Sequence, residues 1–281
     1  MILQCGTHRL DLSTQKIMGI LNITPDSFSD GGSYHHAGHL SLDLVLRRAE
    51  EMLAEGADIL DVGGESTRPG AAMVSEQEEL DRVIPVVEAL VEKLGALVSV
   101  DTSTASVIRE SAKKGAGIIN DVRALMRDGA LVAAAETGLP ICLMHMQGQP
   151  QNMQQAPQYQ DVVAEVVAFL QERIVACSAA GISKERILID PGFGFGKTLA
   201  HNLALLARLS ELAVLDAPIL VGLSRKSLLG QLLNREVDER LPGSLALALA
   251  AAERGSAIIR VHDVAATKDV LAVYAAIKNS I

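Results

Sequence analysis

Short apolar runs alternate along the chain with longer segments of helical periodicity. Eight of these runs are rich in Ile, Val and Leu, and each is followed by a helix candidate: Ile17–Leu21, Asp58–Val62, Leu97–Val100, Gly117–Ile119, Ile141–Met144, Ile187–Ile189, Ile219–Leu223 and Ala257–Val261. Several are apolar at successive positions, which is typical of parallel strands buried on both faces. The repeat therefore predicts an α/β fold, a (β/α)8 TIM barrel.

Two of the intervening segments show the helical pattern most clearly. Ser75–Leu94 carries a single apolar stripe, and Ser75 with Glu78 predicts a capping box at its start. Pro85 predicts a bend within this helix. Asp161–Ala176 repeats the apolar stripe. Both segments have the length and the single apolar face of helices packed on the outside of a barrel.

The first sixteen residues do not fit the strand–helix repeat. They alternate in a β-like manner around Gly6 and Thr7, which predicts an N-terminal β-hairpin that closes the bottom of the barrel. No low-complexity linker divides the rest of the sequence, and composition does not shift between its halves. Residues 1–281 are therefore predicted to form a single barrel domain.

Charge and composition narrow the classes of partner. The chain has 25 Lys and Arg against 34 Asp and Glu, a net charge of −9 with no basic block, which argues against nucleic acid. The apolar run Leu245–Ala252 is far shorter than the roughly 20 residues that cross a bilayer. The N-terminus shows no secretory signal, and the three cysteines are widely spaced, so a cytoplasmic protein with reduced cysteines is expected.

Polar and charged residues follow every predicted strand. Active sites of such barrels lie at the carboxyl ends of the strands, where the sequence places Asn22, Asp61, Asp101, Asn120 with Asp121, His145, Asp190, Ser224 to Lys226, and Arg260 with His262. Any one of them could be a helix cap or a loop anchor. Together, around one mouth, they favour an enzyme.

The residue types in this ring suggest what it binds. Asp101, Asp190, Asn120 and Lys226 mix acceptors with donors, which suits a flat heterocycle with an amino-oxo edge. Two carboxylates could also flank the scissile bond of a glycosidase. The cations Arg68, Lys226 and Arg260, with His262, favour an anion beside the ring, and phosphate is the obvious candidate.

Other features keep more than one interpretation. The glycine-rich stretch from Asp190 to Thr198 follows a strand but lacks the spacing of a nucleotide phosphate loop, so a tight turn carrying Asp190 and Phe195 is favoured. His145 could be a core histidine or a site residue. Arg225 and Asp121 could form a structural ion pair. The histidines of one glycine-flanked loop, His35, His36 and His39, fit a solvated loop better than a zinc site.

Several motifs run in order along the chain: Ile20–Gly32, Gly56–Gly70, Ser99–Thr102, Ile119–Asp121, Asp190–Lys197, Ser224–Ser227 and Arg260–His262. The first two are similar to the two signatures of the dihydropteroate synthase family, and the others continue the resemblance. The resemblance covers residues 17 to 264, nearly the whole chain, and no site position departs from the family pattern. It implies an enzyme, also the target of sulfonamides, that joins 4-aminobenzoate to 6-hydroxymethyl-7,8-dihydropterin diphosphate and releases diphosphate.

The resemblance also implies roles for individual residues. Asp101, Asn120, Asp190 and Lys226 would hold the pterin, with Asp101, Asp190, Lys226, Arg260 and His262 as the catalytic set. Thr67, Arg68, Arg260 and His262 would meet the diphosphate, and Phe28, Pro69, Phe195 and Ser227 would line the aminobenzoate pocket. Asn22 would be a ligand of Mg2+, and the protein would be a homodimer.

Two other functions stay open from the sequence. A pterin-dependent methyltransferase also resembles this barrel but has no use for a diphosphate cluster, and a pterin-binding barrel without activity has no need of Asn22. The segments Thr24–His39 and Gly63–Ser75 are long for connections that usually have about 2–6 residues. They are therefore expected to close over the diphosphate and to complete the aminobenzoate pocket only then.

Overall fold

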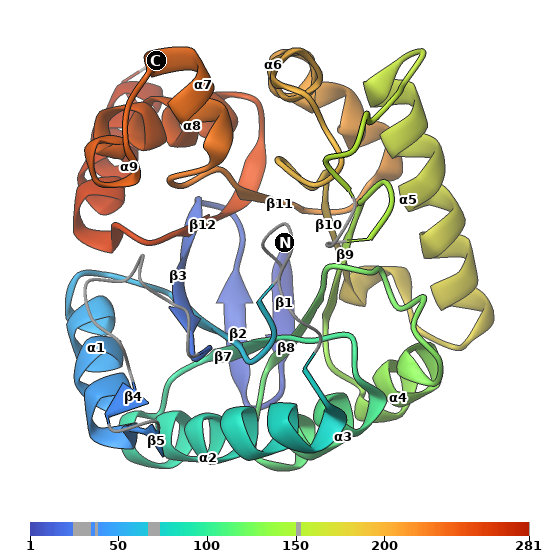
Figure 1. Ribbon diagram of the computed structural model, residues 1–281, viewed down its shortest axis with the longest axis vertical. Coiled ribbons are helices and arrows are strands. Elements are labelled where there is room, and N and C mark those ends of the chain that lie inside the picture. The colour runs from blue at the N-terminus through green and yellow to red at the C-terminus, as the bar shows by residue number, and fades with distance from the viewer. Residues whose placement is uncertain (25–34, 37–38, 67–73, 150–152, 281) are drawn as a thin grey trace.

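The computed structural model describes residues 1–24, 35–36, 39–66, 74–149 and 153–280, with only the backbone of 35–36 and 39–40 (Figure 1). Eight parallel strands close into a barrel in the order β3-β6-β7-β8-β9-β10-β11-β12. Their bounds are β3 Lys16–Asn22, β6 Ile59–Gly63, β7 Val98–Asp101, β8 Ile118–Asp121, β9 Ile141–Met144, β10 Ile187–Asp190, β11 Ile219–Gly222 and β12 Ser256–Val261. The predicted TIM barrel is confirmed, and each strand lies within two residues of its predicted bounds.

The register of the sheet brings the predicted strand ends to one rim. Gly63 pairs with Asp101, Asp101 with Asn120, and Asp190 with Met144. Neighbouring strands therefore end at similar heights, and the polar residues at those ends gather at the mouth of the barrel.

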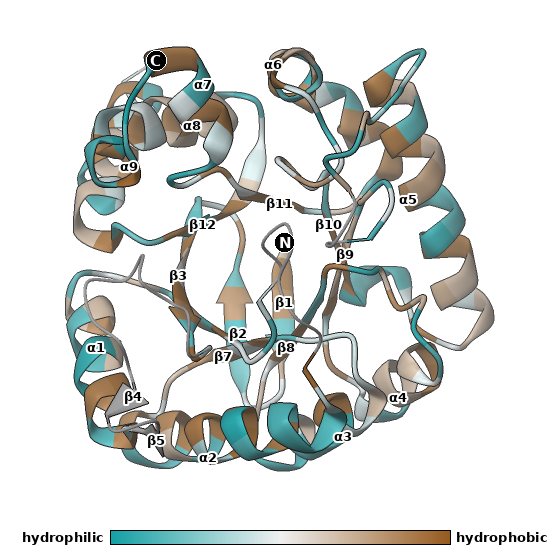
Figure 2. Ribbon diagram, in the orientation of Figure 1, coloured by the Kyte–Doolittle hydropathy of each residue, from teal (hydrophilic) through white to brown (hydrophobic). Residues whose placement is uncertain are grey.

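Helices wrap the outside of the barrel, as Figure 1 shows. They are α1 Leu42–Ala54, α2 Glu76–Leu94, α3 Ala105–Lys113, α4 Ala130–Thr137, α5 Val162–Ala179, α6 Leu199–Ala207, α7 Ser227–Leu233, α8 Leu241–Glu253 and α9 Val264–Lys278, with short 3-10 turns at Lys184–Arg186, Leu209–Leu215 and Val237–Glu239. The capping box of Ser75 and Glu78 is confirmed at the start of α2. Figure 2 shows apolar and polar residues alternating around these helices, and the apolar positions supply most of the core between helices and strands.

The predicted N-terminal hairpin is present and lies at the bottom of the barrel. Strand β1 (Ile2–Cys5) pairs antiparallel with β2 (His8–Asp11) through a turn at Gly6, whose φ is +58°. Leu3, Cys5 and Leu10 pack into one cluster with the first inward residues of the strands, from Met18 of β3 to Ile258 of β12. The hairpin therefore seals the amino-terminal end of the interior with apolar side chains.

Two smaller features complete the fold. Strands β4 (His35–His36) and β5 (His39–Leu40) form a short antiparallel pair that the sequence did not predict. Within the part of the chain that the structure describes, no helix is long and apolar enough to span a bilayer.

Candidate active site

Three charged side chains and one amide, from four strands, meet inside the mouth of the barrel. Arg260 of β12 donates from Nε to Asp61 of β6 at 2.6 Å and from Nη2 to Asp101 of β7 at 3.2 Å. Asn120 of β8 donates from Nδ2 to the carboxylate of Asp61 at 3.3 Å. The structure thus brings together Asp101, Asn120 and Arg260. It adds Asp61, for which the sequence predicted no role beyond a position at a strand end.

Burial changes the acidity of the two carboxylates assigned to the pterin. Desolvation raises the pKa of Asp101 to about 7, against the attraction of Arg260 and with help from the charge of Asp61. Desolvation also raises the pKa of Asp190 to about 6, although the Gly192 N–H donates to its carboxylate at 2.7 Å. Carboxylates with such raised pKa values are typical of functional sites, because a cationic ligand or an N–H donor recovers the cost of burying them.

The stretch after β10 forms a tight turn, as predicted. Gly192 has a φ of +70°, and a Cβ there would lie 1.9 Å from the carbonyl oxygen of His145, so only glycine fits. The turn carries Phe195 to the mouth, where the Lys226 Nζ lies 4.3 Å from the centre of its ring. Burial, and the charge of Arg260, lower the pKa of Lys226 to about 8.

Lys197 argues against a nucleotide phosphate loop at this turn. Its ammonium is buried and donates to the carbonyls of Gly192 at 2.9 Å and Phe195 at 3.1 Å. It also lies 2.9 Å from Nδ1 of His145, whose pKa burial lowers to about 3. Lys197 therefore stabilises the turn through hydrogen bonds to its carbonyl groups. His145 is a core histidine with a hydrogen-bond partner, which is one of the two interpretations that the sequence left open.

The segment after β11 places Lys226 and Ser227 at the start of α7. Arg225 adopts a left-handed φ of +55° and pairs with Asp263 through Nε at 3.0 Å and Nη2 at 2.5 Å. The possible ion pair between Arg225 and Asp121 is therefore wrong, because Arg225 pairs with Asp263, just beyond β12. Nδ1 of His262 lies 3.0 Å from the Ser224 hydroxyl. Burial and the neighbouring cations Arg260 and Arg225 lower the pKa of His262 to about 3, so its ring is neutral at physiological pH.

Asp121 instead organises the loop after β8. Its buried carboxylate accepts from the backbone N–H groups of Arg123 at 2.7 Å and Leu125 at 2.9 Å, and from the Ser103 hydroxyl. Two consecutive residues of this loop, Ala124 and Leu125, have left-handed φ values of +50° and +59°. Such strain persists only where surrounding contacts hold it, and the hydrogen bonds of Asp121 supply them here, which also fix Val122 and Arg123 between Asp121 and the strained pair.

One of these two residues, Arg123, reaches across the rim. It forms a bidentate pair with Glu65, with both N–O distances 2.9 Å and both side chains about one-tenth exposed. Glu65 belongs to the segment that follows β6 and leads toward Thr67 and Arg68. No local pattern in the sequence marks this pair, because its members are 58 residues apart.

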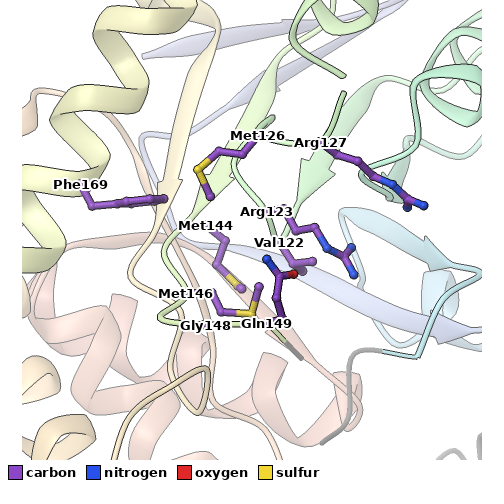
Figure 3. Close-up of a pocket in the computed structure, with 9 residues that line it drawn as sticks. All are labelled: Val122, Arg123, Met126, Arg127, Met144, Met146, Gly148, Gln149 and Phe169. Atoms are coloured by element: carbon purple, nitrogen blue, oxygen red, sulfur yellow. The ribbon is translucent and has the colours of Figure 1, made fainter. Parts of the chain in front are cut away.

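A cavity of about 370 Å³ opens beside the strand ends of β8 and β9 (Figure 3). Figure 3 shows Met144 and Met146 at its centre, Phe169 reaching in from α5, and the guanidinium groups of Arg123 and Arg127 on the other side. Val122, Met144 and Met146 also form a buried cluster with Phe195. The sequence did not predict this methionine-rich wall, because no pattern identifies which apolar residues border a cavity.

Of the remaining predicted site residues, Asn22 is described and four others are not. Phe28, Thr67, Arg68 and Pro69 lie outside the described residues, as do the side chains of His35, His36 and His39 and most of the two long segments expected to close. Asn22 ends β3, and its Oδ1 lies 3.6 Å from where a Cβ at Gly63 would be. Within the described ranges, no three His, Cys, Asp or Glu side chains are placed to hold a metal ion by themselves.

Comparisons with known proteins give the family. Residues 18–262 match the family described as pterin binding enzyme. The dihydropteroate synthase of Escherichia coli K12 is 60% identical over 264 residues, which cover 94% of this chain and 92% of that protein. The solved dihydropteroate synthase of Yersinia pestis in a sulfonamide drug complex has a TM-score of 0.95 and 56% identity, and covers 99% of this chain and 100% of its own. That of Xanthomonas albilineans with 4-aminobenzoic acid has a TM-score of 0.91 and 51% identity, over 99% and 98% of the two chains. The chain therefore belongs to the dihydropteroate synthase family of pterin-binding enzymes.

Proposed function

We propose that the protein is a transferase that joins 4-aminobenzoate to 6-hydroxymethyl-7,8-dihydropterin diphosphate, forming dihydropteroate and diphosphate for folate biosynthesis. One observation carries the proposal: a single barrel mouth holds a mixed hydrogen-bonding set, Asp101, Asn120 and Asp190, beside the cations Lys226 and Arg260. A flat amino-oxo ring that bears an anionic leaving group matches both halves of this site. The identity to dihydropteroate synthases over nearly the whole chain supports the same reaction.

The chemistry asks the protein mainly to stabilise charges as they separate. When the C–O bond to diphosphate breaks, a cation delocalises into the pterin ring. The amine of 4-aminobenzoate then attacks the exocyclic carbon, and the resulting ammonium loses a proton to solvent. Asp101 and Asp190 stabilise the cationic ring, while Arg260 stabilises the departing diphosphate. The neutral ring of His262 can hydrogen-bond beside the diphosphate without competing for a proton.

A divalent cation fits this site together with the substrate. Gly63 has no side chain, so space remains between Oδ1 of Asn22 and the carboxylate of Asp101, 3.6 Å and 3.8 Å from the position of the missing Cβ. Mg2+ prefers oxygen ligands and keeps several of them from water or phosphate, so a site with few protein ligands suits it when diphosphate supplies the rest. Asn22 would hold the ion, and the ion would neutralise the leaving diphosphate.

Relatives solved with ligands support a position for the second substrate. The Xanthomonas albilineans enzyme was solved with 4-aminobenzoic acid, and the Yersinia pestis enzyme with a sulfonamide drug. We infer that this chain binds the same two kinds of molecule where Phe195 borders Lys226 and Ser227 begins α7. Phe28, Thr67, Arg68 and Pro69 would complete that pocket and the diphosphate site.

We also infer a homodimer, by resemblance to the family. Large apolar side chains are exposed on α7, at Leu232 and Leu233, and on α9, at Val273 and Ile277. Such exposed apolar surface supports a contact with a second copy. Sedimentation at several protein concentrations measures the oligomeric state, and a monomer throughout the range would reject this part of the proposal.

The two alternative functions have less support. A methyltransferase would not need Arg260 and Lys226 at one rim, and a binding protein without activity would not need an amide oxygen set beside a carboxylate at Gly63. The deciding assay mixes protein, Mg2+, the pterin diphosphate and 4-aminobenzoate and measures dihydropteroate. Absence of product would reject the proposal, and methyl transfer from methyltetrahydrofolate to a corrinoid would favour the methyltransferase.

The order of bond breaking can be tested separately. With a non-nucleophilic aminobenzoate analogue in the site, C–O cleavage before attack would let the bridging oxygen label scramble in recovered substrate. A label that stays in place while normal turnover is fast would show that the amine attacks before the bond has broken.

A further inference from the structure

Asp61 has no contact with substrate in the reaction proposed above, yet its carboxylate lies at the centre of the polar network. It lies between Leu60 and Val62 in the middle of β6, and none of its surface is exposed. A fully buried carboxylate is costly unless charged and polar groups compensate it. Those groups are Arg260 and Asn120, and both of them face the ligand in the proposed reaction.

Asp61 first fixes the plane of the Arg260 guanidinium. Arg260 donates from Nε to Asp61 at 2.6 Å and from Nη2 to Asp101 at 3.2 Å. Because the guanidinium is rigid and planar, two partners on neighbouring strands determine its orientation. Its other N–H groups are then the donors available to an anion. Without Asp61, Asp101 alone would hold the group, and its plane could rotate.

Asp61 also fixes which way the Asn120 amide points. The Asn120 Nδ2 lies 3.3 Å and 3.5 Å from the two oxygens of Asp61. An ionised carboxylate only accepts hydrogen bonds, so the amide nitrogen must face it, and the amide orientation follows from this network. Oδ1 of Asn120 is consequently the end that a ligand meets, and it is an acceptor.

We propose that Asp61 is a positioning residue that sets the hydrogen-bonding pattern of the pterin site, turning the Asn120 oxygen and the remaining Arg260 donors toward the ligand. This inference rests on the proposed function, because the ligand is the pterin diphosphate. It makes Asp61 a specificity determinant: the ring must offer an N–H at Asn120 and carry its anion at Arg260. A purely structural ion pair would stabilise the barrel without affecting either choice.

A double-mutant cycle separates these two roles. Asp61→Asn keeps the shape of the side chain but removes the charge, so the two facing amides can each turn either way. Asn120→Asp alone places two carboxylates together. The double variant Asp61→Asn/Asn120→Asp keeps one carboxylate and one amide, so the charge is conserved. The new amide at position 61 can accept from Arg260 and donate to the new carboxylate at position 120, and that carboxylate presents an acceptor to the ring. The pattern is therefore restored with the two partners exchanged.

The measurement is calorimetric titration of the folded protein with 6-hydroxymethylpterin in the presence of Mg2+ and diphosphate. Each single variant is expected to bind at least about tenfold more weakly, the lower limit for losing a hydrogen bond to a charged group. The double variant is expected to recover to within about threefold of the unmodified protein. Asp58→Asn is the matched control, immediately before β6, where Asp58 accepts from the Ile17 N–H at 2.9 Å. It should leave the affinity unchanged.

Each outcome decides the inference. Losses that add in the double variant, or an Asp61→Asn variant that binds normally, would overturn it. If Asp61→Asn does not fold, recovery of binding in the double variant still supports the inference. A double variant that folds but does not bind the pterin rejects the inference. A double variant that does not fold rejects it as well. Failure of the unmodified protein to bind the pterin would instead count against the proposed function.

Discussion

The two ends of the barrel interior are built by the same strands from opposite kinds of side chain. At the bottom the inward residues include Ile59, Ile118, Leu188 and Ile258, packed under the N-terminal hairpin. Two residues further along the same four strands stand Asp61, Asn120, Asp190 and Arg260. Side chains two apart on a strand share a face, so a single step of the pleat converts a dry core into a charged site.

The difference shows what each end contributes. Apolar residues at the bottom stabilise the fold, since the hairpin removes them from water. The charged residues at the mouth are buried almost as deeply, and their raised or lowered pKa values show that the fold holds them against a cost of desolvation. The apolar packing at the bottom of the barrel therefore offsets the desolvation cost of the charged residues at the mouth.

Substituting one residue at each end of β10 tests this division, and the loss of pterin affinity at the mouth should be the largest effect. Asp190→Asn is expected to weaken pterin binding by about 10–150-fold, because an amide replaces a charge-assisted acceptor. It should leave the fold intact, since burial opposes the charge of Asp190. Leu188→Ala, at the bottom of the same strand, should lower the free energy of unfolding by about 2–5 kcal/mol and leave the pterin affinity of folded molecules unchanged.

Calorimetric titration and denaturant unfolding of both variants give the two readouts. Asp101→Asn offers a second variant at the mouth, with the same expected direction. Normal affinity in both aspartate variants would remove these residues from the site, and weak binding by folded Leu188→Ala would show that the two ends are not separable.

The sequence predicted the strands and their polar ends because both follow from a local pattern, a short apolar run that ends in a polar residue. It could not predict which partner each polar group would take. The sequence left an ion pair between Asp121 and Arg225 open, yet Asp121 holds its own loop and Arg225 pairs with Asp263. The pair of Arg123 and Glu65 was missed for the same reason, since such contacts depend on how distant loops approach one another.

A change of pH should affect stability and binding in opposite directions. The raised pKa values of Asp190, about 6, and Asp101, about 7, mean that the folded state takes up protons more readily than the unfolded chain. Between pH 7 and pH 5 these two groups therefore add stability as the pH falls, and they lose it as the pH rises. Pterin binding needs both carboxylates ionised, so affinity should fall about tenfold per pH unit between pH 7 and pH 6, and about a hundredfold per unit below pH 6.

The check is a series of titrations and thermal unfolding curves from pH 8 to pH 5. The double variant Asp101→Asn/Asp190→Asn is the control, because it lacks both titrating groups. If its pH dependence matched that of the unmodified protein in both measurements, other residues would be responsible.

Loss of the predicted metal ligand should have a smaller effect. Asn22→Ala removes a protein oxygen near Gly63, and water can take its place. The Mg2+ concentration for half-maximal activity is expected to rise about tenfold, the lower part of the range for groups that support a metal. Activity measured against Mg2+ concentration gives this value, with maximal activity largely restored at high Mg2+. An unchanged Mg2+ requirement would mean that Asn22 is not a ligand.

The smallest expected effect lies at the boundary between the two ends, on β7. Ser99 stands between Leu97 of the bottom cluster and Asp101 of the mouth, and it is fully buried. Its hydroxyl has no hydrogen-bond partner among the residues that the structure describes. A buried hydroxyl without a partner costs about 1–3 kcal/mol, which the small cavity left by its removal partly offsets. Ser99→Ala should therefore raise the free energy of unfolding by up to about 1 kcal/mol, and the melting temperature by up to about 2 °C.

Ser103→Ala, four residues further on, is the matched control for this substitution. The Ser103 hydroxyl donates to Asp121 and accepts from Arg123, so its removal should destabilise the protein. Thermal unfolding of the two variants compares the same lost atom in a dry interior and in a polar network. Equal destabilisation by both would mean that Ser99 already belongs to the polar end. The polar end of this strand would then begin at Ser99, two residues before Asp101. A stabilised Ser99→Ala variant would instead mean that it begins at Asp101.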